Sequence, residues 1–239
     1  MSRDSEAKTL RRAEPFAAIF ARAAERHGGA DALETRIAPT ATGEKTAAEI
    51  AALGDDRILS EMTRRVFQAG FNWSVIDGKW AGFEAAFEGF PVGRWTLMSD
   101  ADLDRLLGDA GIVRHAKKIE AVRDNAIFLQ RLAQERGSAA RAIAEWPASD
   151  YVGLLNRLKR EAARMGGTTA QYFLRGIGKE SFVLSRDVIA ALVRAGVVDK
   201  APTSKAGLAA TQAAFNAWAA ESGRSLTEIS RVLALSGDA

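Results

Sequence analysis

Apolar residues recur at helical spacing along almost the whole chain, and this periodicity is the strongest constraint on its fold. In the segment 112–136, for example, Ile119, Val122, Ala126 and Leu129 share one face of an expected helix. Strand-like alternation never extends beyond a few residues, and its best short run is SFVLS at 181–185. Alanine is abundant and proline occurs only 5 times, which favours helices. The sequence therefore predicts an all-α protein, with helices that include 57–70 and 79–88.

Composition excludes several classes of protein. A chain of 239 residues can form one large domain or two lobes around a substantial core. No apolar stretch approaches the length of a membrane span, and the N-terminus lacks an apolar signal core, so we expect a cytoplasmic protein with no membrane partner. With 0 cysteines and 2 histidines, we expect neither a disulfide nor a metal site, and no cofactor. The net charge of +3 fits a polyanionic partner without demanding one.

Two adjacent glycines interrupt the helical pattern in ARMGGTTAQYF, residues 163–173. Gly166 and Gly167 are expected to end one helix, and Thr168 or Thr169 to cap the next. Free backbone amides and the positive end of the second helix would then form an anion site, for which phosphate is the obvious ligand. The alternative is an ordinary corner between helices with glycine at its C-cap, and the local pattern alone favours it.

An aspartate follows a predicted helix start in SRDVIAALVRAG, residues 185–196. Ser185 is expected to cap the helix, which places Asp187 in its first turn, where the helix N-terminus favours the anion. One interpretation is helix-end electrostatics alone. The other is a fixed negative charge that stabilises a developing cation or activates water. By the same pattern, Ser99 is expected to cap a helix together with Asp102.

Aromatic and basic residues gather in two further stretches. Most of the aromatics are expected in the core, whereas Trp73, just after the expected helix 57–70, is placed to line a pocket mouth and stack on an extruded base. In 109–126, His115 is expected to cap or pack, and the cations to form a solvated face or a nucleic-acid contact. The aromatics concerned are Phe67, Phe71, Trp73, Trp80, Phe83, Phe87, Phe90 and Trp95.

These stretches together resemble the helix-hairpin-helix DNA glycosylase superfamily, and within it DNA-3-methyladenine glycosylase I. FQAGFNWSVIDGKWAGFEAAF is similar to that family's Gln-Ala-Gly-x-x-Trp stretch and the helix after it. LLGDAGIVRHAKKIEAVRDNA resembles its Asp-x-Gly-Ile-x-Arg-x-x-x-Lys-Ile-x-Ala-x-x-x-Asn-Ala stretch closely, and MGGTTAQYF resembles the superfamily hairpin. The resemblance covers roughly residues 57–200.

The resemblance implies roles for individual residues. Asp187 matches the catalytic aspartate that lies about twenty residues beyond the hairpin. Thr168 stands where lyase-type members carry a lysine, which implies a monofunctional enzyme that uses water as nucleophile. The implied base pocket comprises Trp73, Gln68, Phe71 and Arg65. The implied DNA contacts are the hairpin amides and nearby cations, namely Gly166, Gly167, Thr168, Thr169, Lys117, Lys118 and Arg164.

The implied function is that of a monofunctional DNA glycosylase of base-excision repair. It would hydrolyse the N-glycosidic bond of an alkylated, 3-methyladenine-like base after flipping the nucleotide out of double-stranded DNA. The expected protein is a bacterial cytoplasmic monomer whose partner is damaged duplex. Two departures support the alternative of a non-catalytic or altered-specificity DNA-binding or damage-sensing protein. The family's zinc site has no cysteines here, and Arg65 replaces a pocket glutamate eight residues before Trp73.

Two lobes are expected from this resemblance. Residues 57–179 should form one helical lobe that ends in the hairpin helix. Residues 1–56 should form an N-terminal helical extension that packs with residues 180–239, which complete the second lobe. Asp187 would then lie near the junction of the lobes, where pockets commonly form.

Overall fold

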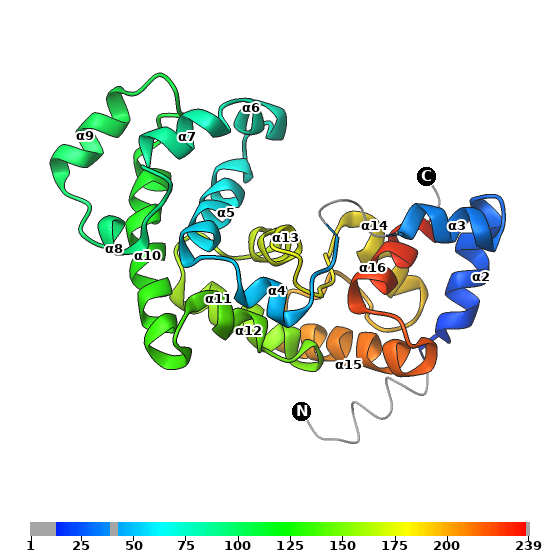
Figure 1. Cartoon of the computed structure of the whole chain (residues 1–239). Coiled ribbons are helices and arrows are strands. Elements are labelled where there is room, and N and C mark those ends of the chain that lie inside the picture. Colours follow the sequence, from blue (N-terminus) through cyan, green and yellow to red (C-terminus); the bar gives the residue numbers. More distant parts are fainter. Residues whose placement is uncertain (1–12, 39–42, 238–239) are drawn as a thin grey trace. The chain divides into compact units, whose positions relative to one another are not determined.

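The computed structural model describes residues 13–38 and 43–237, which form helices joined by short connections (Figure 1). The all-α prediction is confirmed, since these described residues contain no strand. Part of the expected N-terminal extension, residues 1–12 and 39–42, lies outside the described residues. The chain divides into two compact units, each with its own core.

The first unit contains the described residues up to Glu44, residues 147–153 and the described residues from Glu180 onward. Helix α16 is its central element and contacts four other helices of the unit (Figure 1). The helices are α2 (Phe16–Arg26), α3 (Ala30–Ile37), the short 3-10 helix η1 (Ala148–Asp150), α14 (Arg186–Arg194), α15 (Lys205–Ser222) and α16 (Leu226–Leu235).

The SFVLS run forms an irregular connection in this unit. The backbone N–H of Ser181 donates to Thr227 Oγ1 at 3.1 Å, and that of Val183 donates to Ser230 Oγ at 3.1 Å. Phe182 between them is fully buried, and its ring lies 4.3 Å from that of Phe215. Side-chain hydroxyls of α16 therefore satisfy the backbone donors that a partner strand would otherwise satisfy.

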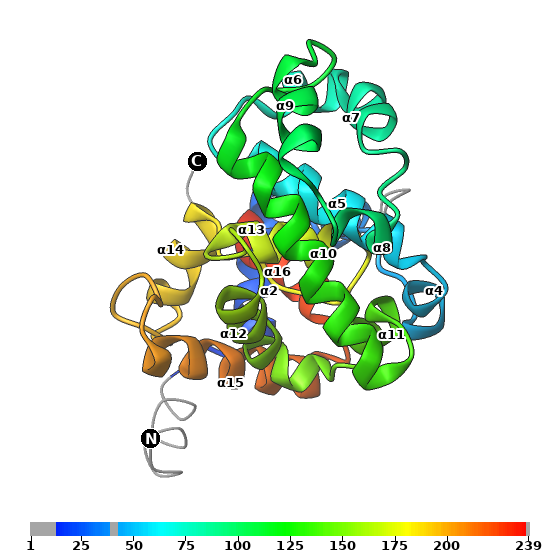
Figure 2. The ribbon, with the colours of Figure 1, turned by 90° about the vertical axis from the view of Figure 1, so that its left-hand side faces the viewer.

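The second unit contains residues 45–146 and 154–179. Helix α10 is its longest helix and runs past α5, α8, α9 and α11 (Figure 2). Helix α12 (Tyr151–Glu161) contributes its residues after Gly153 to this unit. The other helices are α4 (Ala47–Ala51), α5 (Asp55–Gln68), α6 (Trp73–Gly78), α7 (Trp80–Ala86), α8 (Val92–Trp95), α9 (Asp100–Gly108), α10 (Ala116–Arg136), α11 (Ala139–Ala144) and α13 (Thr168–Gly176).

Residues 45–56 cluster with this second unit, whereas the sequence analysis grouped them with the N-terminal extension. Helix α4 packs on α11. The carboxylate of Asp55, in the first turn of α5, accepts the backbone N–H groups of Ala139 and Ala140 at 3.0 and 2.9 Å. An anion at a helix N-terminus satisfies donors that have no partner within the helix. This interaction fixes α5 to α11.

Short helices surround an aromatic core in the second unit. Phe83 and Phe87 are fully buried, and the ring of Phe87 lies 5.0 Å from Phe90 and 4.9 Å from Trp95. Trp95 Nε1 donates to the carbonyl of Phe87 at 2.7 Å, so its buried polar atom has a partner. These aromatics are in the core, as predicted. The sequence analysis missed α6, a short helix that Asn72 caps by accepting the N–H of Ser74.

Close contact between Gly82 of α7 and Gly111 brings α7 against the start of the stretch 109–126. A Cβ added to Gly82 would lie 2.4 Å from the carbonyl oxygen of Gly111, far inside contact distance. Lys79 Nζ donates to the carbonyl of Ala110 at 2.7 Å in the same turn. Asp109 Oδ1 accepts the N–H of Gly111 at 2.7 Å and holds the turn in shape. The Asp-x-Gly part of the motif is thus a packing surface for α7.

We expect Gly82→Ala to lower the free energy of unfolding by about 1–3 kcal/mol, because backbone must move to admit the methyl group. Urea denaturation measures this change. Gly78→Ala is the matched control, since a Cβ on Gly78, also in a short helix, would meet nothing within 4 Å. The control should be neutral or slightly stabilising. Equal unfolding free energies for the two variants would contradict the close approach described here.

Candidate functional site

Gly166 and Gly167, the adjacent glycines of the sequence analysis, lie in the turn between α12 and α13. Helix α12 already ends at Glu161, so the glycines do not terminate it. Gly167 is the N-cap residue of α13, with φ 60° and ψ −136°, a conformation open essentially to glycine alone. The expected capping by Thr168 or Thr169 is therefore wrong: α13 begins at Thr168, and no side chain caps it. Gly166 and Gly167 are both exposed, which leaves the turn accessible.

Two contacts fix this turn to α10. Asn125 is fully buried, and its Oδ1 accepts the N–H of Ala163 at 2.8 Å while its Nδ2 donates to the carbonyl of the same residue at 3.3 Å. Arg164, whose φ is 59°, donates from Nε to the carbonyl of Lys117 at 3.0 Å. The stretch 109–126 therefore positions the hairpin. The sequence analysis gave Asn125 no role, although its place in the motif was the signal.

A cavity of about 290 Å³ lies beside the N-terminus of α13, within the second unit. Trp73 meets Tyr172 edge-to-face, with ring centroids 5.0 Å apart, and its side chain remains 43% exposed. One open aromatic wall and the first residues of the hairpin helix thus border the same space. The lining residues are Arg65, Gln68, Ala69, Gly70, Trp73, Thr168, Thr169 and Tyr172.

The charged group that faces this cavity is the guanidinium of Arg65. Its Nη2 lies 2.6 Å from Glu61 Oε1, and its Nη1 donates to Gln68 Oε1 at 2.9 Å. Its Cζ sits 5.4 Å from the centroid of the Trp73 ring, a cation–π distance. Gln68 in turn donates from Nε2 to Asp77 Oδ1 at 2.9 Å. Each end of the Gln68 amide thus makes one hydrogen bond within the protein, and Gln68 lines the cavity as part of the expected base pocket.

Glu61 is a site residue that the sequence analysis missed, although it lies one helical turn before Arg65 on α5. Burial raises the pKa of Glu61, and the adjacent Arg65 opposes that shift. The carboxylate presses on the backbone of α13, because a Cβ on Gly176 would lie 2.0 Å from Glu61 Oε1 and 2.6 Å from Arg65 Nη2. The pair is thus held between two helices.

Phe71, which was expected in the base pocket, is not among the residues that line the cavity. Its ring stands edge-to-face with His115, 6.2 Å away, and 4.4 Å from Lys118 Nζ. His115 occupies the N-cap position of α10 but makes no side-chain capping bond, so it packs rather than caps.

Lys118 is buried, which corrects its expected role as a phosphate contact. Its ammonium donates to the carbonyl of Phe67 at 3.2 Å and also to the carbonyl of Ala69, at the end of α5. Burial, with a smaller contribution from the nearby charge of Arg164, lowers the pKa of Lys118 to about 8. Lys117 and Arg164, by contrast, are exposed beside the hairpin turn.

Asp187 lies in the first unit, in the first turn of α14, as predicted. Ser185 caps this helix by accepting the N–H of Val188 at 3.3 Å, which confirms the predicted helix start. The side chain is exposed, and no hydrogen bond or ion pair engages its carboxylate within the described part of its unit. The Ser99–Asp102 cap is likewise confirmed.

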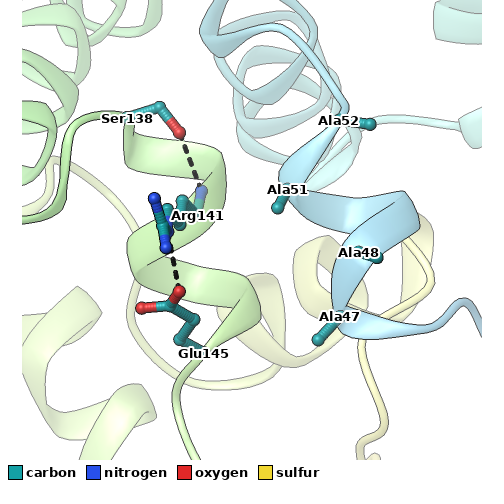
Figure 3. Close-up of a pocket in the computed structure, with 7 residues that line it drawn as sticks. All are labelled: Ala47, Ala48, Ala51, Ala52, Ser138, Arg141 and Glu145. Atoms are coloured by element: carbon teal, nitrogen blue, oxygen red, sulfur yellow. Dashed lines mark hydrogen bonds and ion pairs between the residues drawn. The ribbon is translucent and has the colours of Figure 1, made fainter.

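A second cavity, of about 490 Å³, lies between α4 and α11 in the same unit as the first (Figure 3). Ala47 and Ala51 of α4 face α11 across it. On α11, Arg141 Nε donates to Glu145 Oε1 at 2.7 Å, so the two charged groups neutralise each other. Alanine methyl groups and a closed ion pair offer little chemistry. The candidate site is therefore the first cavity.

The described residues offer neither a metal site nor a membrane span. Over residues 13–38 and 43–237, no group of three or more His, Asp or Glu side chains could hold a metal ion. The zinc site implied by the family resemblance therefore does not fit these residues. None of the helices described is long and apolar enough to cross a membrane.

A hairpin whose second helix opens onto an aromatic cavity is the arrangement expected of helix-hairpin-helix proteins. The family model for methyladenine glycosylases matches residues 50–178, so the chain belongs to the methyladenine glycosylase family. The match includes the hairpin and every residue that lines the cavity, and it ends before Asp187.

The chain is similar to the following proteins of known name. The chain is 28% identical over 130 residues to DNA-3-methyladenine glycosylase 1 of Escherichia coli strain K12, covering 46% of this chain and 70% of that protein. A crystal structure of 3-methyladenine DNA glycosylase I is 24% identical with a TM-score of 0.46, over 57% of this chain and 82% of the other. The Staphylococcus aureus enzyme is 22% identical with a TM-score of 0.49, over 66% and 90%.

We expect Lys118→Met to lower the free energy of unfolding by about 1–3 kcal/mol, because it leaves buried carbonyls at the end of α5 without their donor. The pKa of about 8 adds a pH dependence. Between pH 8 and about 10 the unfolded chain keeps this lysine protonated and the folded protein does not, so wild-type stability rises relative to the variant. Urea denaturation across this range measures both effects. A variant as stable as wild type would contradict the structural role of Lys118.

Proposed function

We propose that the chain is a monofunctional DNA glycosylase that releases a methylated base from double-stranded DNA. The observation that carries the proposal is the shared wall of the cavity, where Trp73 and Tyr172 lie beside Thr168 and Thr169 of the hairpin helix. An enzyme that acts on a base must take it out of the stack and hold it against aromatic side chains. A hairpin that grips the backbone next to such a cavity supplies both requirements.

The exposed turn of the hairpin is the proposed contact with the DNA backbone. Amides around Gly166 and Gly167 are accessible, and phosphate contacts of this kind position a duplex without reading its sequence. Lys117 and Arg164 stand beside the turn, since Arg164 donates to the carbonyl of Lys117. Both side chains are exposed, so they can neutralise phosphates on either side of an extruded nucleotide.

The proposed chemistry is hydrolysis with water as the nucleophile. No lysine lines the cavity in the described chain, and Thr168 stands at the first position of the hairpin helix. The bond between C1′ of the sugar and the base nitrogen breaks, and the base leaves with the bonding electrons. A water oxygen then bonds to C1′ and gives up a proton. We assign to Asp187 the stabilisation of the sugar cation and the orientation of this water.

We expect Asp187→Asn to slow base release by about 100-fold or more while duplex binding stays near the wild-type value, because the substitution removes only the negative charge to which we assign stabilisation of the sugar cation. Base release from methylated duplex, followed by mass spectrometry, measures the rate. Asp31→Asn is the matched control, since Asp31 is another exposed first-turn aspartate of the same unit. Wild-type release by Asp187→Asn would contradict the assignment. A wild-type protein that binds damaged duplex but releases no base would instead indicate damage sensing.

We expect Lys117→Ala and Arg164→Ala each to reduce the slope of log affinity against log salt concentration by about 1, because each removes one phosphate contact. Fluorescence anisotropy with labelled duplex at several salt concentrations measures the slope. Arg131→Ala is the control, since Arg131 is exposed on the same helix several turns away from the hairpin. Slopes that match wild type in both test variants would place the DNA contact elsewhere.

A further inference from the structure

Arg65 and Glu61 form an ion pair beside the cavity. Arg65 lines the cavity and Glu61 does not. Glu61 is instead wedged against α13 at Gly176, where an added Cβ would lie 2.0 Å from its carboxylate oxygen. Both side chains are only 17% exposed. A molecule in the cavity therefore contacts Arg65 and not Glu61, and the carboxylate acts on it through Arg65.

The guanidinium is held from two directions. Nε donates to Glu61 Oε1 at 2.6 Å, Nη2 lies 2.6 Å from the same oxygen, and Nη1 donates to Gln68 Oε1 at 2.9 Å. Gln68 is itself fixed by its bond to Asp77. The guanidinium carbon lies 5.4 Å from the centroid of the Trp73 ring. These contacts leave little freedom to the side chain, so its remaining donors are preorganised.

Two donors of this guanidinium remain available. Arginine carries five N–H groups, one on Nε and two on each terminal nitrogen. Nε donates one hydrogen to Glu61 and Nη1 donates one to Gln68, and Nη2 lies 2.6 Å from the Glu61 oxygen, which leaves at least one N–H on Nη1 and one on Nη2. Within the described residues these two have no acceptor. A pair of N–H groups on one planar cation suits two adjacent acceptor atoms.

We propose that Arg65 is a specificity-determining residue, and that the cavity takes a guanine-type methylated base in preference to a methylated adenine. Guanine presents two adjacent acceptors, O6 and N7, which is the edge that arginine reads in a bidentate way. Adenine presents the acceptor N7 beside an amino group, whose hydrogens oppose those of Arg65. A guanine methylated at N3 keeps both acceptors free. This inference rests on the proposed glycosylase function.

The acid behind Arg65 makes such a site compatible with a charged lesion. A base methylated on a ring nitrogen carries positive charge while it is bonded to the sugar, and an isolated arginine would repel it. Glu61 offsets the charge of Arg65 at 2.6 Å, so the pair presents donors with little net charge. Glu61 is thus a positioning residue, which fixes the orientation of Arg65 and neutralises it.

The test compares the release of 3-methylguanine and 3-methyladenine from the same methylated duplex. Wild type should release the guanine faster. Arg65→Lys, which keeps the charge but loses the planar pair of donors, should reduce this preference by roughly 10- to 100-fold, the range expected for one bidentate contact. Arg57→Ala is the matched control, because Arg57 of the same helix pairs with Glu84 and does not line the cavity. It should keep the wild-type preference.

A second variant protects the test against misfolding, since removal of Arg65 alone would leave the buried Glu61 unpaired. The double variant Glu61→Gln/Arg65→Gln removes both charges and keeps a polar side chain at each position. It should fold and should release the two bases without the wild-type preference. A preference unchanged in both Arg65→Lys and the double variant overturns the inference, even if total activity falls.

Binding of the free bases separates this inference from the proposed function. Calorimetric titration of 3-methylguanine and 3-methyladenine into wild type and Arg65→Lys measures affinity without any bond cleavage. If wild type releases neither base from DNA, the proposed function fails. Tighter binding of 3-methylguanine by wild type, lost in Arg65→Lys, would still support the inference. Equal affinities for the two bases in wild type would overturn it.

Discussion

The hydrogen bonds between the buried amide of Asn125 and the backbone of Ala163 are the interaction on which the site depends. They satisfy the donor and the acceptor of one peptide position in an irregular turn, and this fixes the start of the hairpin against α10. Because α10 also packs on α5, the same contact sets α13 beside the end of α5. The cavity is lined by residues of α5, α6 and α13 and by the two residues after α5, so its shape depends on an asparagine that does not line it.

The cavity combines an exposed aromatic wall with a charged side chain whose position is restrained by hydrogen bonds. Trp73 is accessible, whereas Arg65 is held by Glu61 on one side and by Gln68 on the other. Such a division suits a pocket that receives its ligand from outside, because stacking tolerates many rings while a fixed donor pair accepts few edges. Lys118, unlike Arg65, is a cation that does not line the cavity. It is buried against the carbonyls that end α5 and contributes to the framework of the pocket rather than to its surface.

Much of this architecture could be predicted from the sequence, and the failures have physical causes. Helical periodicity gave the all-α class, and the spacing of serine and aspartate gave the caps at Ser99 and Ser185. Thr168 looked like a cap, but the backbone of Gly167 already turns the chain into α13. Lys118 looked like a surface lysine beside Lys117, although helical spacing places it on the face that Val122 and Asn125 also occupy. The position of Asp187 was predicted within its helix, and its role stays a prediction.

Gly176 has a consequence beyond the packing of two helices. It stands at the end of α13, outside the cavity lining, and the absence of a side chain is what leaves room for the ion pair behind the pocket wall. A methyl group there would displace the Glu61 carboxylate or the Arg65 guanidinium, so a change at position 176 also affects positions 61 and 65. Recognition of a ligand by Arg65 therefore also depends on Glu61 and Gly176, which the ligand does not touch.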